Sequence, residues 1–293
     1  MRDHDRLAER FEAHRSHLRA VAYRMLGSLS EADDAVQEAW LRLSRSDTSS
    51  VENLAGWLTR VVGRVCLDML RSRTSRREEP LDPQQPGPIV NGQSERDPEQ
   101  EALLADSVGL ALLVVLDRLA PAERVAFVLH DLFAVPFDQI APIVERTPTA
   151  TKKLASRARH RVQGAAPSPD TDLTRQRHLV DAFLAATRGG DLNTLLAVLD
   201  PDVVRRADRA ALPAGPAELR GAQAVAEETR VFSRRARSAR LALVDGTVGI
   251  VVAPRGRLLL ALSLTIKDHK ITEIDVIADP SRLHQLDLAV LIN

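Results

Sequence analysis

The segment Asp138–Val162 constrains the fold more than any other part of the chain. It begins with apolar residues at helical spacing, continues through a short polar break at Glu145–Pro148, and ends in a basic stretch without an acidic residue. The apolar residues are Ile140, Ile143 and Val144, and the cations are Lys152, Lys153, Arg157, Arg159 and Arg161. This order predicts a helix-turn-helix whose second helix meets DNA. Thr147 is the expected N-cap of that helix, with Pro148 at its first position.

Composition limits what surrounds this element. The chain has 293 residues, 44% hydrophobic and 27% charged, which is enough for several globular domains. Its net charge is zero, so any nucleic-acid surface must be local. The single cysteine, Cys66, allows neither an internal disulfide nor a cysteine-based metal site, and no cofactor is expected. Residues 1–10 lack the apolar core of a signal peptide, and no apolar run approaches the roughly 20 residues of a membrane span. These features favour a cytoplasmic protein.

Changes in pattern divide the chain into four parts. Residues 5–77 read as helical throughout, and 78–98 form a proline-rich linker. Residues 99–164 are helical again and contain the helix-turn-helix. Residues 172–293 change to helices followed by strands. The expected strands are Arg240–Val244, Thr247–Ala253, Arg257–Lys267 and Lys270–Ile277, with a hairpin turn at Asp245-Gly246. Their nearly continuous apolar runs suggest burial on both faces, one of them lining a cavity.

The first helical block contains three amphipathic helices. They span Leu7–Leu26, Glu31–Arg45 and Leu54–Ser72, and the first should bury Phe11, Leu18, Val21, Ala22 and Met25. Gly27 suits a left-handed cap after the first helix, and Ser30 with Asp33 suits a capping box at the start of the second.

Two of these helices carry polar faces of opposite character. The second helix shows an acidic and polar side, formed by Asp34, Gln37, Glu38 and Arg42. The third shows a basic side, formed by Arg60, Arg64, Arg71 and Arg73. Asp68 interrupts that basic side, and helical spacing predicts a salt bridge with Arg64 or Arg71. Trp57 lies on the apolar stripe and is expected to pack in the core.

Several segments together resemble the sigma-70 family. Gly27–Leu43 resembles the polymerase-binding helix of its extracytoplasmic-function (ECF) group, and Ala55–Arg73 resembles the helix that opens the minus-ten promoter element. Leu116–Val162 is similar to sigma region 4, and the last part is similar to the SnoaL-like extension of SigJ-type members. The resemblance implies two all-α domains, sigma regions 2 and 4, followed by an α+β SnoaL-like domain built as a cone-shaped barrel.

The resemblance also assigns roles to residues. It implies that Asp34, Gln37, Glu38 and Arg42 dock on the β′ clamp of core RNA polymerase, and that region 4 meets the β flap. It implies minus-ten contacts from Ser49, Asn53, Arg60, Arg64, Arg71 and Arg73. Minus-thirty-five contacts are expected from Thr149, Thr151, Lys152, Lys153, Ser156 and Arg157.

The sequence departs from the family pattern at three places. Glu145 occupies a turn position where many members have glycine, which implies conformational strain if the backbone there is left-handed. The linker lacks the Trp-Leu-Pro motif, and only Asp208 remains of an Asp-Gly-Gly-Gly motif in the extension.

Three functional classes follow from these patterns. A sigma factor modulated by its C-terminal domain is favoured; such a chain would be monomeric when free, and its C-terminal domain has room for a small ligand. A ligand-sensing regulator that acts without polymerase is the first alternative. The second is a SnoaL-like isomerase or cyclase fused to a DNA-binding module, with Asp202, Asp208, Asp245, Asp275 and His269 as acid–base candidates. No pair of these has a spacing that requires catalysis, so no catalytic residue is expected.

Overall fold

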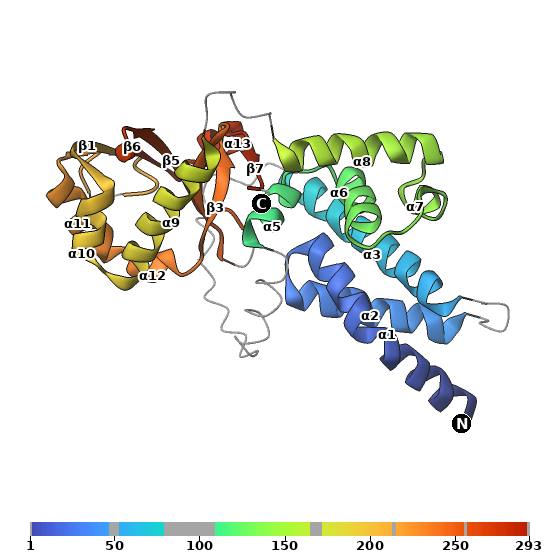
Figure 1. The fold of residues 1–293 in the computed structure, drawn as a ribbon. Coiled ribbons are helices and arrows are strands. Elements are labelled where there is room, and N and C mark those ends of the chain that lie inside the picture. Colours follow the sequence, from blue (N-terminus) through green and yellow to red (C-terminus); the bar gives the residue numbers. More distant parts are fainter. Residues whose placement is uncertain are drawn as a thin grey trace. The chain divides into compact units, whose positions relative to one another are not determined.

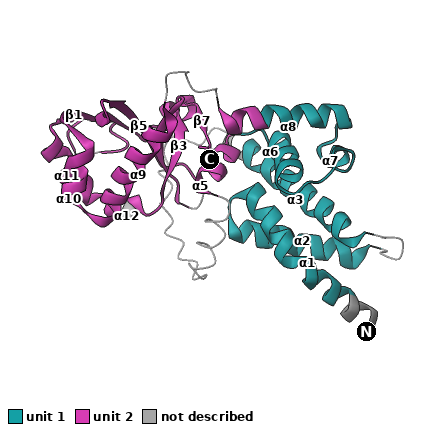
Figure 2. Cartoon of the chain, in the orientation of Figure 1, with its two compact units in different colours: residues 1–108, 119–158 teal, residues 109–118, 159–293 magenta. Residues whose placement is uncertain are grey.

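The computed structural model describes residues 2–46, 53–78, 109–164, 172–212, 215–254 and 257–291 (Figure 1). The chain forms two compact units (Figure 2). Unit 1 comprises residues 1–108 and 119–158, and unit 2 comprises 109–118 and 159–293. The second helical block is therefore shared between them, a division that the sequence pattern did not reveal. In the part of the chain just defined, no helix is both long and apolar enough to cross a membrane.

Three long helices form the first part of unit 1: α1 (Arg2–Leu26), α2 (Leu29–Arg45) and α3 (Leu54–Glu78). They pack on one another, and all five residues that the sequence predicted to be buried in α1 are at most 1% exposed. Gly27 has a φ of 72°, as expected for a left-handed cap. The predicted capping box is wrong, because Ser28 is the N-cap of α2 and accepts a hydrogen bond from the Glu31 amide. Asp33 instead binds Arg19 of α1 at 2.7 Å.

The second part of unit 1 consists of α6 (Pro121–Phe127), a π-helical turn (Val128–Leu132), α7 (Phe137–Val144) and α8 (Pro148–Gln163), whose last residues belong to unit 2. Here α3 packs directly against α6 and α7. Gly63 allows this approach, since a β-carbon there would lie 3.2 Å from Leu129 Cδ1 and 3.4 Å from Ile143 Cδ1. Cys66 is buried in the same helix, and burial raises its pKa to about 12, so the thiol stays protonated.

Unit 2 begins with α5 (Leu110–Asp117) and continues after α8 with α9 (Leu173–Gly189) and α10 (Leu192–Val198). The strands are β1 (Leu199–Ala207), β2 (Glu218–Arg220), β3 (Ala239–Val244), β4 (Thr247–Val252), β5 (Leu260–Lys267), β6 (Lys270–Ile277) and β7 (Leu288–Ala289). Helices α11 (Ala222–Val231) and α12 (Ser233–Ala236) precede β3, and α13 (Pro280–Gln285) precedes β7.

These strands form one sheet in the order β2-β1-β6-β5-β4-β3-β7. Among the strand pairs of the described residues, only β1–β6 is parallel. The expectation of a barrel is corrected, because the sheet stays open with the short strands β2 and β7 at its two edges. Helices α9, α10 and α11 pack against the sheet around a core that includes Phe183, Leu195 and Ile274.

All four predicted strands are present, and the described residues contain three more. The hairpin at Asp245-Gly246 is confirmed by positive φ angles of 50° and 79°. Strand β5 begins at Leu260 rather than Arg257. Strands β1, β2 and β7 were missed: β1 carries an Asp-Pro pair and several charges, and β7 is only two residues long. On β4, Ile250, Val251 and Val252 are all buried, as expected for a strand covered on both faces.

Candidate nucleic-acid interface and C-terminal cavity

The basic helix α8 presents one exposed face. Thr147 caps its N-terminus, with Oγ1 accepting a hydrogen bond from the Ala150 amide at 3.2 Å, as predicted. Thr149, Lys152, Lys153 and Arg157 are exposed, and Ser156 is half-buried between them. Their spacing of three and four residues places them along one side of the helix. This side combines cations with hydroxyl groups, the chemistry that binds phosphates and base edges.

Thr151 does not belong to that face, and its predicted DNA contact conflicts with the structure. Its side chain is fully buried, and Oγ1 donates to the Thr147 carbonyl at 2.9 Å. Thr151, Ala155, Ala158 and Val162 recur at helical spacing and are all buried. This stripe attaches α8 to the protein interior, so Thr151 is structural.

Arg157 is held from the side by a buried acid. Its Nε donates to Glu123 Oε1 of α6 at 2.9 Å, and the Glu123 side chain is only 7% exposed whereas that of Arg157 is 61% exposed. The carboxylate therefore orients a guanidinium that still faces solvent.

The arginines on α3 have partners within unit 1. Arg64 donates to Glu145 Oε1 at 2.6 Å and to the Ile143 carbonyl at 3.0 Å, and Arg71 reaches Glu145 Oε2 at 3.4 Å. The predicted pair between Asp68 and Arg64 is confirmed at 3.5 Å. The hydrogen bond from Arg64 lowers the pKa of Glu145, and the same bond raises the pKa of Arg64. One carboxylate of the helix-turn-helix thus binds two predicted minus-ten contacts.

Glu145 makes these contacts from a strained position. It is the residue at the turn between α7 and α8, and its φ of 58° and ψ of 45° are left-handed. A side chain with a β-carbon is disfavoured there relative to glycine. The strain that the sequence suggested is therefore present, and the acid at this position is tied to α3.

The other predicted minus-ten residues differ in surroundings. Arg73 donates to the Leu26 carbonyl at 3.0 Å and to Glu31 of α2 at 3.0 Å, so it joins the ends of three helices. Asn53 caps α3 by accepting a hydrogen bond from the Gly56 amide at 2.9 Å. Arg60 is exposed. Ser49 lies outside the described residues.

The acidic face of α2 is accessible. Asp34 and Gln37 are exposed, and Glu38 binds Arg42 at 2.9 Å one turn further on. Leu41 lies one turn after Gln37 and is 37% exposed, an apolar side chain that the sequence reasoning missed on this face. Its spacing from Asp34 and Gln37 is the signal that would have identified it. An exposed leucine beside acidic groups suits a protein partner more than nucleic acid.

A groove of about 340 Å³ separates part of α2 from α3. Arg42 and Arg73 both line it, together with Glu31 and Asp68. The groove therefore brings one predicted polymerase contact close to one predicted minus-ten contact.

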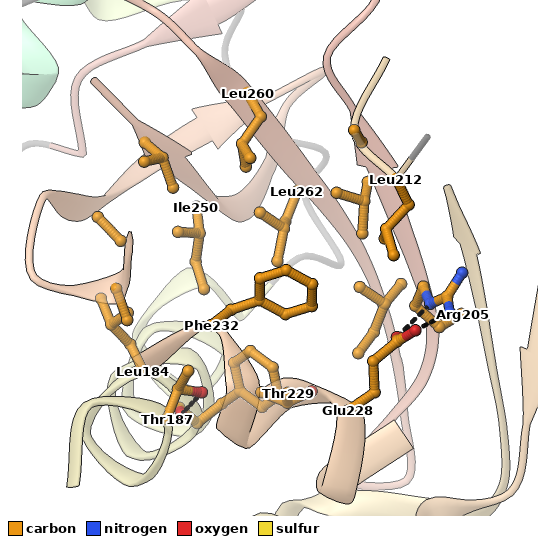
Figure 3. Close-up of a pocket in the computed structure, with 17 residues that line it drawn as sticks. Leu184, Thr187, Arg205, Leu212, Glu228, Thr229, Phe232, Ile250, Leu260 and Leu262 are labelled. Carbon is orange, nitrogen blue, oxygen red and sulfur yellow. Dashed lines mark hydrogen bonds and ion pairs between the residues drawn. The ribbon is translucent and has the colours of Figure 1, made fainter. Parts of the chain in front are cut away.

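Unit 2 contains a cavity of about 100 Å³ (Figure 3). Its walls come from α9, α11, α12, β1 and the strands β3 to β6, and they are mostly apolar. Figure 3 shows the Phe232 ring among Ile250, Leu262 and Leu212, with the Arg205–Glu228 pair at one side. The remaining polar lining groups are the hydroxyls of Thr187 and Thr229.

The acid–base candidates proposed from sequence do not line this cavity. Asp208 accepts hydrogen bonds from the amides of Ala211, Ala278 and Asp279, each at 2.9 Å. Burial alone would raise the pKa of Asp208, but these amides together lower it. Asp245 accepts a hydrogen bond from the Asp287 amide at 2.8 Å, and His269 lies in a turn with a φ of 61°. These positions stabilise loops and turns.

Two parts of the second helical block are held within unit 2. Helix α5 packs against β3 and β7. The guanidinium of Arg118, at the end of α5, donates to the carbonyls of Leu283 and Leu286. Near the end of α8, the Val162 carbonyl accepts a hydrogen bond from the Val290 amide at 2.9 Å.

Comparison with known proteins gives a consistent result. The family described as Sigma-70 region 2 matches residues 10–76, and that described as Sigma-70, region 4 matches residues 109–162. A probable ECF RNA polymerase sigma factor SigI of Mycobacterium tuberculosis is 36% identical over 98% of both chains. The ECF RNA polymerase sigma factor SigJ of the same species is 38% identical over 93% of this chain and 91% of its own.

Similar solved structures match the chain over different lengths. The crystal structure of SigJ from M. tuberculosis covers 94% of this chain and 98% of its own, with 35% identity and a TM-score of 0.46. A SnoaL-like protein of unknown function from Burkholderia thailandensis covers 38% of this chain and 98% of its own, with 17% identity and a TM-score of 0.31.

Proposed function

The chain belongs to the ECF sigma factors of the sigma-70 family, and on that premise we propose which of its surfaces binds polymerase and which bind promoter DNA. The α2 face around Gln37 binds core RNA polymerase at the β′ clamp, and region 4 binds the β flap. The α3 arginines hold opened minus-ten DNA, and the exposed face of α8 reads the minus-thirty-five element. This work takes place in the cytoplasm, and the free chain is a monomer.

The exposed acidic face of α2 is the observation that carries the polymerase assignment. Gln37 and Asp34 are accessible while the opposite side of the helix is buried. A regulator that acts alone has no need for such a docking face, and it generally dimerises to read two half-sites. A matching apolar contact is available from Leu41.

The C-terminal domain modulates this activity through region 4. Support comes from the assignment of residues to units, because α5 lies within the region 4 match yet packs on β3 and β7. Arg118 reinforces this attachment through two backbone carbonyls. Any rearrangement of the sheet edge would therefore reach the first helix of region 4. We assign the domain a regulatory rather than a catalytic role, since Asp208 and Asp245 bind backbone amides and none of the acid–base candidates lines the cavity.

The test is run-off transcription with purified core polymerase on a template that carries the gene's own upstream region. Transcripts that depend on the full chain are expected, and a Gln37→Ala/Glu38→Ala variant should lose most of them. A direct core-binding assay completes the test, because this variant should bind core at least about tenfold more weakly. Glu9→Ala/Glu12→Ala, which removes two acids from the exposed side of α1, serves as the matched control.

Two results would contradict the proposal. Normal core binding by the Gln37/Glu38 variant would show that the docking face is wrongly assigned. A stable dimer of the free chain that binds duplex DNA specifically without polymerase would favour the independent regulator. For the C-terminal domain, Arg118→Gln should change the transcript yield while core binding stays normal; an unchanged yield would argue against modulation through α5.

A further inference from the structure

The cavity of unit 2 has the size of a small-molecule site. It encloses about 100 Å³, and an engineered apolar cavity of about 150 Å³ is known to bind benzene. A ligand without movement of the walls is therefore limited to roughly one ring or a short branched chain. The apolar walls, which include Phe232, Ile250 and Leu262, favour a mostly apolar body.

The buried ion pair decides the charge of the occupant. The Arg205 side chain is 3% exposed, and its Nε donates to Glu228 Oε2 at 2.8 Å. Nη2 binds the other oxygen of Glu228, and Nη1 donates to the Pro216 carbonyl at 2.8 Å. Every nitrogen of the guanidinium is thus engaged and its charge is neutralised. A charged ligand would leave an uncompensated charge in an apolar wall, which is strongly unfavourable. The occupant must be neutral.

The threonine hydroxyl groups of the cavity wall indicate which polar group a bound molecule would carry. Thr187 Oγ1 donates to the Phe183 carbonyl at 2.8 Å, and Thr229 Oγ1 donates to the Val225 carbonyl at 2.7 Å. Both hydroxyl protons are therefore used inside their own helices, while oxygen lone pairs remain. The carboxylate of Glu228 also retains acceptor capacity. The two threonine oxygens and the Glu228 carboxylate therefore offer hydrogen-bond acceptors to an occupant of the cavity.

We infer that this cavity binds a neutral one-ring or short-chain molecule with an apolar body and a single hydrogen-bond donor, a phenol or an alcohol. Ala239 of the cavity wall begins β3, the strand on which α5 packs, so a bound ligand would influence α5 and through it region 4. This regulatory role of the ligand rests on the proposed function. Binding of the ligand itself does not depend on the proposed sigma function.

The test is fluorine NMR titration of the full chain with 4-fluorophenol, 4-fluorotoluene and 4-fluorobenzoate. The first two have nearly the same shape, and in a cavity without an acceptor the toluene would bind more tightly, since it brings no polar group out of water. The expected order is phenol first, toluene second and benzoate last. One hydrogen bond corresponds to about a two- to tenfold difference in affinity.

Variants make the assignment specific. Thr187→Val/Thr229→Val removes both hydroxyl acceptors at constant shape and leaves only the Glu228 carboxylate, so the preference for 4-fluorophenol over 4-fluorotoluene should shrink. Thr272→Val makes the same change on β6 outside the cavity and should leave the order unchanged. Ala239→Ile fills the cavity and should abolish binding of all three probes.

Each other result would overturn the inference. Tighter binding of 4-fluorotoluene to the unaltered chain would remove the donor requirement, and tightest binding of 4-fluorobenzoate would refute the charge argument. No binding by any probe would mean that the cavity is not a site. The NMR titrations need no polymerase, so a negative result would refute the ligand site without bearing on the sigma function. In run-off transcription, 4-fluorophenol should change the yield of the unaltered chain and not that of Ala239→Ile; equal yields would refute the regulatory role alone.

Discussion

Two basic helices of this protein, α3 and α8, look alike in sequence but differ in the structure. On α8 the side chains of Lys152 and Lys153 are exposed, and within the described residues neither lysine has an ion-pair partner. On α3, by contrast, Arg64 and Arg71 bind Glu145, and Arg73 binds Glu31. The comparison teaches that a basic face of a helix is not always free to bind DNA. Lys152 and Lys153 of α8 can contact phosphate directly, whereas Arg64 and Arg71 of α3 must first release the Glu145 carboxylate.

The largest effect on promoter binding should come from the exposed lysines of α8. Lys152→Ala/Lys153→Ala removes two exposed cations, so promoter affinity of the holoenzyme should fall on the order of tenfold or more. The slope of log affinity against log salt should decrease in magnitude by about two, one for each lost phosphate contact. Fluorescence anisotropy at several salt concentrations measures both. Lys267→Ala, an exposed lysine of unit 2, is the control, and an unchanged slope would show that the two lysines do not meet phosphate.

The second-largest effect should be on the stability of unit 1, where substitution of two arginines of α3 should give different results. Arg73→Met loses bonds to Leu26 and Glu31, which should destabilise unit 1 by about 1–2 kcal/mol. Arg60→Met removes an exposed cation from the same helix and should have almost no effect on stability. Urea unfolding followed by tryptophan fluorescence reports on unit 1 alone, because both tryptophans, Trp40 and Trp57, lie in it. Equal midpoints for the two variants would remove the distinction.

A smaller effect is expected at the turn that joins the two regions. Glu145→Gly removes the acid that binds Arg64 and Arg71 and relieves the left-handed strain, so run-off transcription should rise about two- to fivefold. The fold should be kept, since glycine suits this backbone. Glu12→Ala, which breaks the exposed pair with Arg15, is the matched control. Lower transcription with intact core binding would mean that the pairs with Glu145 assist initiation.

The smallest effect concerns pH. The pKa of Glu145 is lowered in the folded protein, so its ion pairs contribute stability above the unfolded pKa of about 4.3 and lose it as the pH falls through the folded value. The difference in urea midpoint between the unaltered chain and Glu145→Gly should therefore stay constant from about pH 8 to 5 and change only below that range. A change near neutral pH would point to a different titrating group.

Local signals predicted much of the fold. The buried residues of α1, the cap at Thr147 and the turn at Asp245-Gly246 follow from helical spacing, a side-chain oxygen or a paired turn preference. Each depends on neighbours within a few residues. The exposed part of the α8 face followed in the same way, apart from Thr151, whose burial depends on which side of the helix faces the interior.

The sequence by itself determined the helix-turn-helix, the two polar helix faces and the strands β3 to β6, because periodicity and turn chemistry act along the chain. Only the tertiary structure decided that Glu145 binds the arginines of α3, 74 to 81 residues away, and that α5 joins the C-terminal sheet. It also decided the cavity, whose lining residues come from helices and from five strands. These features depend on which surfaces meet, and burial of apolar area selects that pairing without leaving a local pattern in the sequence.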